Sequence, residues 1–294
     1  MAEGDDALRL DRAALRASFE RAGAGGGAVA PLQASVAGEL LERAAAFGLE
    51  PAVVLDLGAG TGGAARELAR CYGGALVIAL DLAEAMLRAA QRRQRLWRRF
   101  APVCGDALRL PLKDASVDLV FSSLTLEWCQ PLALALAEVR RVLRPSGLFA
   151  FSTLGPGTLH ELRNAWAQAD GYSHVNHFHD VHEVGDALVR SGLMEPVLDV
   201  DRIELHYPDA RALMRDLKAL GARNVTAGRP RALTGRGRLE RVRQAYESCR
   251  RGAGLPATCE VIYGVSWGAA GRPAASAAAG LVRIAPGSVG RARH

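Results

Sequence analysis

Short apolar runs alternate with amphipathic stretches along the first half of this chain. Buried strands are predicted at four runs of mostly aliphatic residues, namely 53–57, 75–80, 117–123 and 148–153. Apolar residues recur at helical spacing between these runs, over 64–72, 83–97 and 132–143. Strands that alternate with helices in this way favour a doubly wound, mostly parallel sheet with helices on both faces. The pattern therefore predicts an α/β fold.

The second half is less regular but predicts further elements. Helical spacing appears over 158–166, 181–191, 209–220 and 238–250, while 196–207 and 258–267 have the alternation of strands. The two helical patterns before the last strand suggest a helical insertion over 208–256. Thr158 is predicted to cap the helix that follows it, and residues 144–147 (RPSG) are predicted to form a turn.

The ends of the chain differ from its middle. Two helical patterns, 8–21 and 32–47, are separated by a glycine-rich run at 22–28 that is expected to act as a lid or linker. The predicted organisation is an N-terminal helical segment at 1–34, a main domain at 35–268 and a disordered tail at 269–294, which is rich in alanine, glycine and proline.

Composition narrows the classes of function. The chain has 294 residues, a formal net charge of +6 and five scattered cysteines. No apolar run has the length of a membrane span, and the acidic start is unlike a signal peptide, so a cytoplasmic protein is expected. With 5% aromatic residues and no known motif, nucleic-acid binding is not indicated. The basic surface favours an acidic partner.

A glycine-rich stretch indicates a cofactor site. The strand at 53–57 ends in a turn that contains Gly58, Gly60 and Gly62, and a helical pattern follows. Glycines let the backbone turn sharply and approach a ligand, while the helix offers free N–H groups at its start. The stretch is typical of a nucleoside-cofactor loop. By itself it does not distinguish a dinucleotide from other nucleosides.

Three acids at successive predicted strand ends favour S-adenosylmethionine. Asp56 precedes the glycines, where a carboxylate suits the α-ammonium group of a methionine moiety better than a pyrophosphate. Asp81 follows the next strand and is placed to accept hydrogen bonds from ribose hydroxyls. Asp106, beside Ala107 at the end of a third predicted strand, is placed to accept from the adenine amino group.

The series of Asp56, Asp81 and Asp106 resembles the Rossmann-like class I methyltransferase pattern. Other phrases resemble the malonyl-acyl-carrier-protein O-methyltransferase family of biotin synthesis: FSTLGPGTL at 151–159, HVN at 174–176, DLKALGARN at 216–224, LTGR at 233–236 and the strand at 257–267. The resemblance covers about residues 18 to 267. It departs from the family at Gly26-Gly27, where an aromatic–acidic pair is usual.

This resemblance implies a seven-stranded sheet and a defined reaction. A methyl group passes from S-adenosylmethionine to the free carboxylate of a malonyl thioester, carried by an acidic acyl carrier protein or by coenzyme A. The carboxylate is already ionised at neutral pH, so no general base is required. One or two cationic or hydrogen-bonding groups must recognise it, and the candidates are Lys218, Arg223, Arg231 and Arg236, with Arg231 as the first choice.

Other side chains are assigned to the surroundings of the site. Ser122 and Phe178 are expected to line it. No metal is expected, because His174, His177, His179 and His182 lack the sequence context of a zinc site. Two alternatives stay open at this point: a methyltransferase for another small acid or a quinone, and a non-catalytic binding module that kept the cofactor fold.

Overall fold

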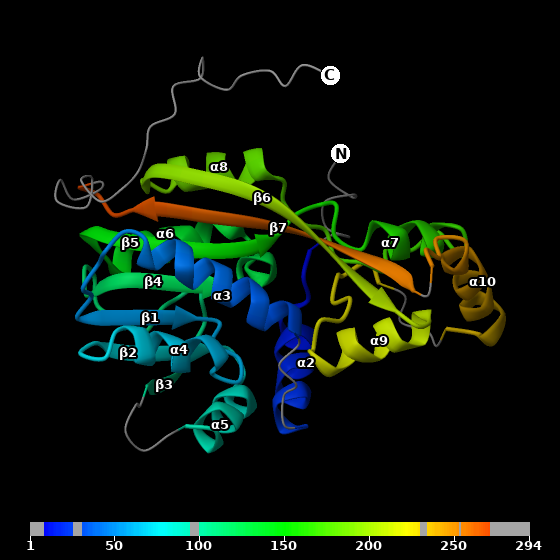
Figure 1. Ribbon diagram of the computed structural model, residues 1–294, viewed down its shortest axis with the longest axis horizontal. Helices are drawn as coiled ribbons and strands as arrows, with labels where there is room; N and C mark the ends of the chain where they lie inside the picture. The colour runs from blue at the N-terminus through cyan, green and yellow to red at the C-terminus, as the bar shows by residue number, and fades with distance from the viewer. Residues whose placement is uncertain (1–8, 26–30, 95–99, 230–233, 253, 271–294) are drawn as a thin grey trace, which may run out of the picture.

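Seven strands form one sheet in the order β3-β2-β1-β4-β5-β7-β6 (Figure 1). The computed structural model describes residues 9–25, 31–94, 100–229, 234–252 and 254–270. All neighbouring strands are parallel except β7, which runs antiparallel to both β5 and β6. The predicted α/β architecture, with its mostly parallel seven-stranded sheet, is confirmed.

The strands follow the predicted apolar runs closely. They are β1 (Val53–Leu57), β2 (Leu76–Asp81), β3 (Ala101–Cys104), β4 (Val117–Ser123), β5 (Leu143–Leu154), β6 (Met194–Tyr207) and β7 (Leu255–Trp267). Strand β1 lies at the centre of the parallel part, where Asp56 is opposite Ala79 of β2 and Phe121 of β4. Because β1, β2 and β4 are parallel, the loops after them open on the same edge of the sheet.

Helices cover both faces of the sheet. On one face α3 (Pro31–Ala45) and α4 (Gly63–Cys71) pack with inward residues of β1 and β2, and α5 (Glu84–Arg92) adds Ala90 to this core. On the other face α6 (Leu132–Val142) and α8 (Val181–Arg190) pack on β4 and β5. Both sides of the parallel strands are therefore buried, which explains why their sequences are continuously apolar.

A third apolar cluster lies at the end of the molecule where β6 and β7 extend beyond the parallel strands (Figure 1). It joins α7 (His160–Ala167) to α9 (Ala210–Ala219) and α10 (Arg236–Glu247). The helices α9 and α10 connect β6 to β7, so the predicted helical insertion before the last strand is present. Tyr246 of α10 is fully buried, and its hydroxyl donates to the Pro256 carbonyl at 2.6 Å.

The N-terminal helix α2 (Arg12–Ala24) is fixed across the carboxyl edge of the sheet. Glu20 accepts the backbone N–H groups of Glu84 and Ala85 at 2.9 and 3.0 Å and thereby satisfies the free start of α5. A Cβ on Gly23 would lie 2.5 Å from the Met86 nitrogen, so this glycine allows close helix contact. Gly26 and Gly27 lie outside the described residues, as does the tail from 271.

Two local predictions are corrected, and one short element was not predicted. Residues 144–147 are not a free turn but part of β5, whose pairing with β4 shifts register between Val117 and Leu119. This extension is held by the chain after β7, because the Gly268 N–H donates to the Gly147 carbonyl at 2.9 Å. The helix predicted over 83–97 ends at Arg92, and η1 (Leu126–Trp128) is a short 3-10 helix that the pattern did not reveal.

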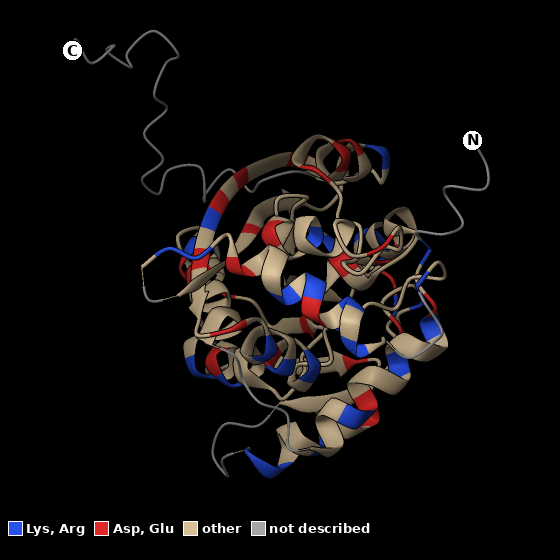
Figure 2. Cartoon of the chain, turned by 90° about the vertical axis from the view of Figure 1, so that its right-hand side faces the viewer, with Lys and Arg blue, Asp and Glu red and all other residues tan. Residues whose placement is uncertain are grey.

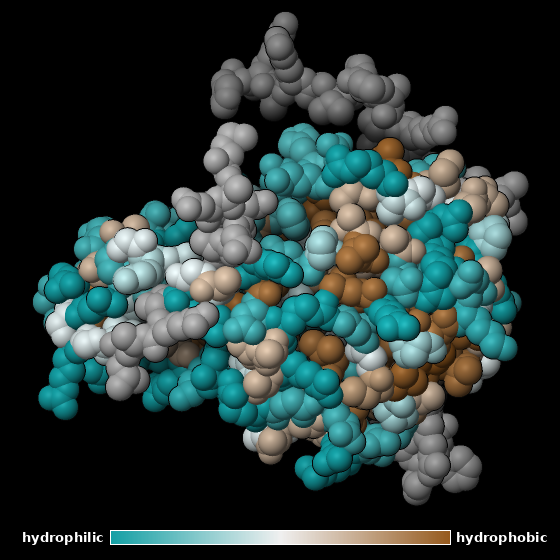
Figure 3. Space-filling model, turned by 180° about the vertical axis from the view of Figure 1, so that it is seen from behind, coloured by the Kyte–Doolittle hydropathy of each residue, from teal (hydrophilic) through white to brown (hydrophobic). Residues whose placement is uncertain are grey.

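The surface is mixed in charge and hydropathy. Figure 2, which faces the α10 end, shows basic and acidic residues interleaved along the helices. Arg243, for example, pairs with Glu240 at 2.6 Å. Figure 3 shows a mostly hydrophilic rear face with apolar residues between the polar ones near its centre. Across the described ranges, no helix is both long and apolar enough to cross a membrane.

Candidate active site

One cavity of about 760 Å³ opens at the carboxyl edge of the parallel strands. Its walls come from the glycine-rich loop after β1, the loops after β2, β3 and β4, the helix α2 and the insertion before β7. This volume is within the usual range for sites that bury a cofactor or a drug-sized ligand. The same cavity therefore joins the predicted cofactor loop to the family-specific second half of the chain.

The glycine-rich loop has backbone angles that favour glycine. Gly58, Gly60 and Gly62 have φ values of +81°, +52° and +73°. The N–H groups of Gly58 and Ala59 donate to the Leu80 carbonyl at 2.8 and 2.9 Å, which ties the turn to the end of β2. No atom lies within 4 Å of a Cβ placed on Gly60, so that residue faces open space. Gly62 begins α4 as its N-cap and does not line the cavity.

Asp56 is a buried acid with an unsatisfied oxygen. The residue is 1% exposed, and its Oδ2 has no hydrogen-bond partner although it borders the cavity wall. Burial, helped by the nearby negative charge of Asp81, raises the pKa of Asp56 to about 7. An orphaned buried carboxylate oxygen requires a donor or a cation. The α-ammonium group of S-adenosylmethionine fits that requirement.

Asp81 already accepts two hydrogen bonds and has acceptor capacity left. Its Oδ2 accepts the Gly60 N–H and its Oδ1 the Ala83 N–H, both at 2.8 Å. Burial raises its pKa to about 6, although these N–H groups favour the ionised form. A carboxylate offers about four lone-pair positions. The carboxylate therefore keeps acceptor capacity for ribose hydroxyls in the cavity that Asp81 lines.

Asp106 and Ala107 line the same cavity from the loop after β3. Asp106 Oδ1 accepts the Leu108 N–H at 2.9 Å, and its Oδ2 forms an ion pair with Arg12 of α2. The three acids that the sequence places at successive strand ends thus surround one cavity, as cofactor binding requires. Arg12 connects the N-terminal helix to this group of acids, a contact that the sequence did not indicate.

The Asp56 carboxyl group predicts how cofactor affinity depends on pH. An ammonium ligand binds the ionised form, so affinity should rise as pH increases through about 7 and level off above it. We expect S-adenosylmethionine to bind about tenfold more weakly at pH 6 than at pH 8. Isothermal calorimetry at both values measures this. The Asp56→Asn variant should bind S-adenosylmethionine more weakly at every pH, and its affinity should not change between pH 6 and pH 8. If the variant kept the pH dependence of the wild type, Asp56 would not be the partner of the ammonium group.

The prediction for Ser122 is corrected. Its side chain is fully buried in the sheet, and its hydroxyl donates to the Leu57 carbonyl of β1 at 3.2 Å. The next residue, Ser123, lines the cavity together with Thr125, Glu127 and Trp128. Alternation along a strand explains the difference, because successive side chains point to opposite faces. Phe178 lies at the cavity wall as expected and is 7% exposed.

The structure separates the four candidate cations. Arg223 lines the cavity and is half-buried, and its guanidinium has no hydrogen-bond or ion-pair partner in the described part of the chain. Lys218 and Arg236 are exposed and are not part of the cavity wall, which corrects the expectation for both. Arg231, the first choice from sequence, lies outside the described residues. Arg12 and Arg66 also reach the cavity, but each has a partner.

The histidines have separate environments. His174 lines the cavity, stacks on Trp166 with ring centroids 3.6 Å apart, and contacts Asp170 through Nε2 at 2.8 Å. His179 lies 3.3 Å from Glu183 through Nδ1. Within the described ranges, no three His, Cys, Asp or Glu side chains form a group suited to a metal ion.

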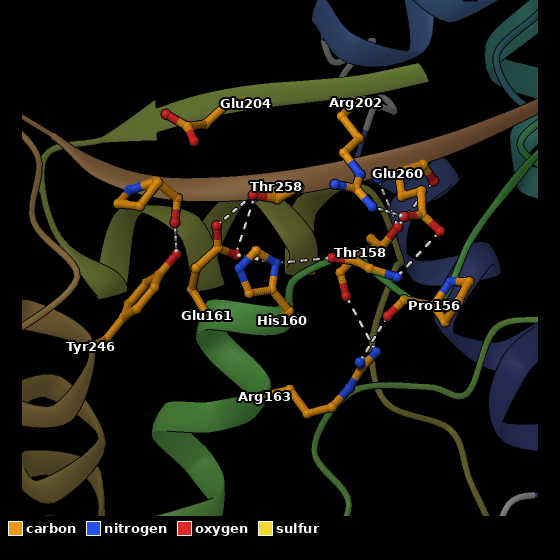
Figure 4. A network of polar contacts seen from close by, with 12 residues as sticks. Pro156, Thr158, His160, Glu161, Arg163, Arg202, Glu204, Tyr246, Thr258 and Glu260 are labelled. Carbon is orange, nitrogen blue, oxygen red and sulfur yellow. Dashed lines mark hydrogen bonds and ion pairs between the residues drawn. The ribbon is translucent and has the colours of Figure 1, made fainter. Parts of the chain in front are cut away.

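The GPGT phrase of the sequence and the start of α7 form a clamp with β7 (Figure 4). The Thr158 hydroxyl donates to the Glu260 carbonyl and accepts the Glu260 N–H, both at 3.1 Å. Glu161 adds a second pair of hydrogen bonds to β7: it accepts the Thr258 hydroxyl at 2.5 Å and the Thr258 N–H at 3.2 Å. Thr158 is therefore not the predicted helix cap: α7 begins after Leu159, whose φ is +52°. The clamp positions Thr158 and Leu159 at the cavity wall.

Removing one hydroxyl of this clamp should cost stability. Thr258→Val leaves a buried oxygen of Glu161 without its donor, since Glu161 is 7% exposed. We expect the free energy of unfolding to fall by about 1–3 kcal/mol, as measured by urea denaturation. Thr234→Val makes the same chemical change at an exposed position and should alter the free energy of unfolding by less than about 0.5 kcal/mol. Equal effects of the two would refute a stabilising role for the clamp.

Sequence comparisons connect this cavity to known proteins. Residues 55–151 match a family model described as a methyltransferase domain. A malonyl-[acyl-carrier protein] O-methyltransferase from Laribacter hongkongensis is 49% identical over 276 residues, which is 91% of this chain and 93% of that protein. One from Halorhodospira halophila is 46% identical over 291 residues, covering 98% of this chain and 99% of that protein.

Solved structures show the same fold at low identity. The YcgJ protein from Bacillus subtilis superposes with a TM-score of 0.57 at 16% identity, covering 81% of this chain and 99% of that one. A putative methyltransferase from Bacillus halodurans gives 0.56 at 18% identity, with 79% and 98% coverage. These likenesses establish the fold alone.

Proposed function

Because the chain belongs to the malonyl-[acyl-carrier protein] O-methyltransferase family, we propose that it transfers a methyl group from S-adenosylmethionine to the free carboxylate of a malonyl thioester. The product is the malonyl methyl ester that primes pimeloyl synthesis for biotin. One observation carries this proposal: the cavity joins the cofactor loop to Arg223, a cation whose guanidinium has no partner among the residues that the structure describes. The cofactor needs the glycine-rich loop, and an anionic acyl group needs the cation.

The residues present fit S-adenosylmethionine, which supplies an electrophilic methyl group on a sulfonium and leaves as a neutral thioether. Asp56 has the unsatisfied oxygen for the ammonium group. Asp81 has lone pairs for the ribose, and Asp106 faces the cavity for the adenine amino group. Gly60 leaves space for the cofactor to approach the backbone. This assignment of Asp56, Gly58, Gly60, Asp81, Asp106 and Ala107 is part of the proposal, with Gly62 supporting the loop from α4.

The protein has to position the substrate carboxylate but does not have to activate it chemically. A carboxylate with an ordinary pKa near 4 is fully ionised at neutral pH, so no side chain has to remove a proton. The protein must hold the carboxylate in line with the methyl group and exclude water. The helix α2 contributes Leu15 and Phe19 to the cavity wall, and Phe19 packs edge-on against Trp128 with centroids 5.4 Å apart. These apolar side chains form part of the cavity wall on the α2 side.

The substrate's carrier is proposed to be an acidic acyl carrier protein in the cytoplasm, with malonyl-coenzyme A as the alternative. The formal charge of +6 supports an acidic partner, because opposite net charges speed association.

Mass spectrometry tests the reaction directly. Malonyl-acyl carrier protein incubated with the enzyme and S-adenosylmethionine should gain the mass of one methyl group on the malonyl chain. Acetyl-acyl carrier protein, which has no free carboxylate, is the control and should gain none. Methylation of an unrelated small acid or a quinone, with none on malonyl thioesters, would favour the other enzyme class. Cofactor binding without turnover on any acceptor would favour a binding module.

Arg223 is proposed to attract the anionic acyl group into the cavity. Arg223→Ala should raise KM for malonyl-acyl carrier protein about tenfold and leave kcat within about threefold, because a long-range attraction contributes to binding. The KM of the wild type should rise with salt, and that of the variant should rise less. Lys218→Ala removes a nearby charge outside the cavity and should change KM by no more than about twofold. A larger effect of Lys218→Ala would reverse the assignment.

A further inference from the structure

Glu127 lies beside the cofactor loop, in the short helix η1 that follows β4. Strand β4 is hydrogen-bonded to β1, so the loop after it meets the glycine-rich turn. Thr125 in this loop is so close that a Cβ on Gly58 would lie 2.0 Å from its Oγ1. Glu127 follows two residues later and lines the main cavity. It therefore borders the cavity in which the cofactor and the acyl chain are proposed to meet.

The surroundings of Glu127 do not suit a negative charge. Its Oε2 accepts a hydrogen bond from the Thr153 hydroxyl at 3.1 Å. Burial raises the pKa of Glu127 to about 8, and only Thr153 and its own amide favour ionisation. The charged or titratable groups that share its surroundings are the Cys129 thiol, the imidazoles of His177 and His179, and the Arg12–Asp106 pair. At neutral pH the group is therefore mostly a carboxylic acid, which has an O–H to donate.

A small second cavity lies on the other side of Glu127. Its volume is about 20 Å³, and it is lined by Glu127 together with Thr153, Gln130, His177 and His179. A polar space of this size holds about one water molecule. His177, which also borders this small cavity, is exposed on the surface.

We propose that protonated Glu127 donates a hydrogen bond to the non-reacting oxygen of the substrate carboxylate and so selects acyl chains that end in a carboxylate. The other oxygen stays free to react, and Glu127 keeps its proton throughout. This inference rests on the proposed function and makes it more specific: Arg223 attracts the anion, and Glu127 binds it at the reacting end.

The charge state of Glu127 is what makes this binding favourable. An ionised Glu127 would repel an incoming carboxylate, whereas a neutral acid donates a strong, charge-assisted hydrogen bond to it. Once the carboxylate is an ester, the hydrogen bond is no longer assisted by charge and is about half as strong. The same residue therefore favours substrate binding and product release.

The pH profile of kcat/KM for malonyl-acyl carrier protein tests the proposal. Between pH 7 and pH 9 the wild type should lose about tenfold as Glu127 ionises. Glu127→Gln keeps an N–H donor of the same shape, so it should retain wild-type activity at pH 7 within about threefold and show no alkaline loss. Glu127→Ala should be impaired mainly in KM at every pH. Glu67→Gln makes the same chemical change at an exposed cavity residue and should keep the alkaline loss.

A binding experiment separates this inference from the proposed function. Calorimetry in two buffers measures proton uptake when malonyl-coenzyme A, a freely diffusing malonyl thioester, binds the enzyme loaded with S-adenosylhomocysteine, where no turnover occurs. At pH 8.5 the wild type should take up a larger fraction of a proton than Glu127→Gln, because Glu127 must be protonated in the complex. Equal uptake, or an alkaline loss that persists in Glu127→Gln, would overturn the role of Glu127 even if methylation is observed. An inactive wild type that still shows the uptake difference would overturn only the reaction.

Discussion

Gly58→Val is expected to abolish cofactor binding and activity. At φ +81° a β-branched residue is strained by about 1–3 kcal/mol, and its Cβ would lie 2.0 Å from Thr125 Oγ1. Because the loop cannot keep its shape, the N–H groups of Gly58 and Ala59 would leave the Leu80 carbonyl that orients the turn. We expect Kd for S-adenosylmethionine, measured by calorimetry, to rise at least about 100-fold.

Two further variants show whether this loss is local. Gly74→Val places the same side chain in a surface turn where nothing lies within 4 Å of the Cβ, and it should bind the cofactor as the wild type does. Gly58→Ala combined with Thr125→Gly removes all three clashing atoms and leaves only the backbone strain, so it should bind more tightly than Gly58→Ala alone. If the double variant is no better, the clash is not the cause.

The parallel core could be predicted from sequence because each of its strands is buried on both faces. A strand such as β1, with Val54, Leu55 and Leu57 fully buried, has a continuous apolar run that only a covered sheet explains. The insertion before β7 was predicted from helical spacing, and Tyr246 confirms that one face of α10 is buried. Local pattern and tertiary packing agree in these elements.

The corrections arise where distant contacts decide the local structure. Pro145 and Gly147 are typical turn residues, yet the chain after β7 holds them in an extension of β5. Thr158 has the sequence of a helix cap, but β7 offers its hydroxyl two partners 102 residues away. Side chains that can hydrogen-bond locally or over a distance are poorly predicted by local pattern.

The residues of the candidate site fall into the same two groups: those that the sequence pattern predicts and those that distant contacts bring into place. Asp56, Asp81 and Asp106 were predicted because parallel topology alone brings strand ends together. Arg12 was not, because α2 reaches the cavity through contacts with no local signal: the Asp11 N–H donates to the Val225 carbonyl at 2.8 Å, and Ser18 to the Gly221 carbonyl at 3.1 Å. The proposed choice of Arg223 among the cations likewise depends on the fold of the insertion, which brings Arg223 to the cavity wall.

Asp81→Ala is the second change with a large expected effect. The ionised carboxylate is proposed to accept both ribose hydroxyls, and a hydrogen bond to a charged group contributes about 1.5–3 kcal/mol. The variant also leaves the Gly60 and Ala83 N–H groups without their acceptor, so the loop loses part of its shape before the cofactor arrives. We expect Kd for S-adenosylmethionine to rise about 100-fold or more, as measured by calorimetry.

Asp118→Ala is the matched control for this prediction. Asp118 also accepts two backbone N–H groups, from Ala52 and Val53 at 3.0 and 2.8 Å, but it does so at the opposite end of β1. Both variants lose a carboxylate that supports β1 or its loop, so both should lower the melting temperature. Only Asp81→Ala should weaken cofactor binding, because only Asp81 lines the cavity. If Asp118→Ala weakened binding equally, the loss would reflect general destabilisation, and Asp81 would have no special part in holding the ribose.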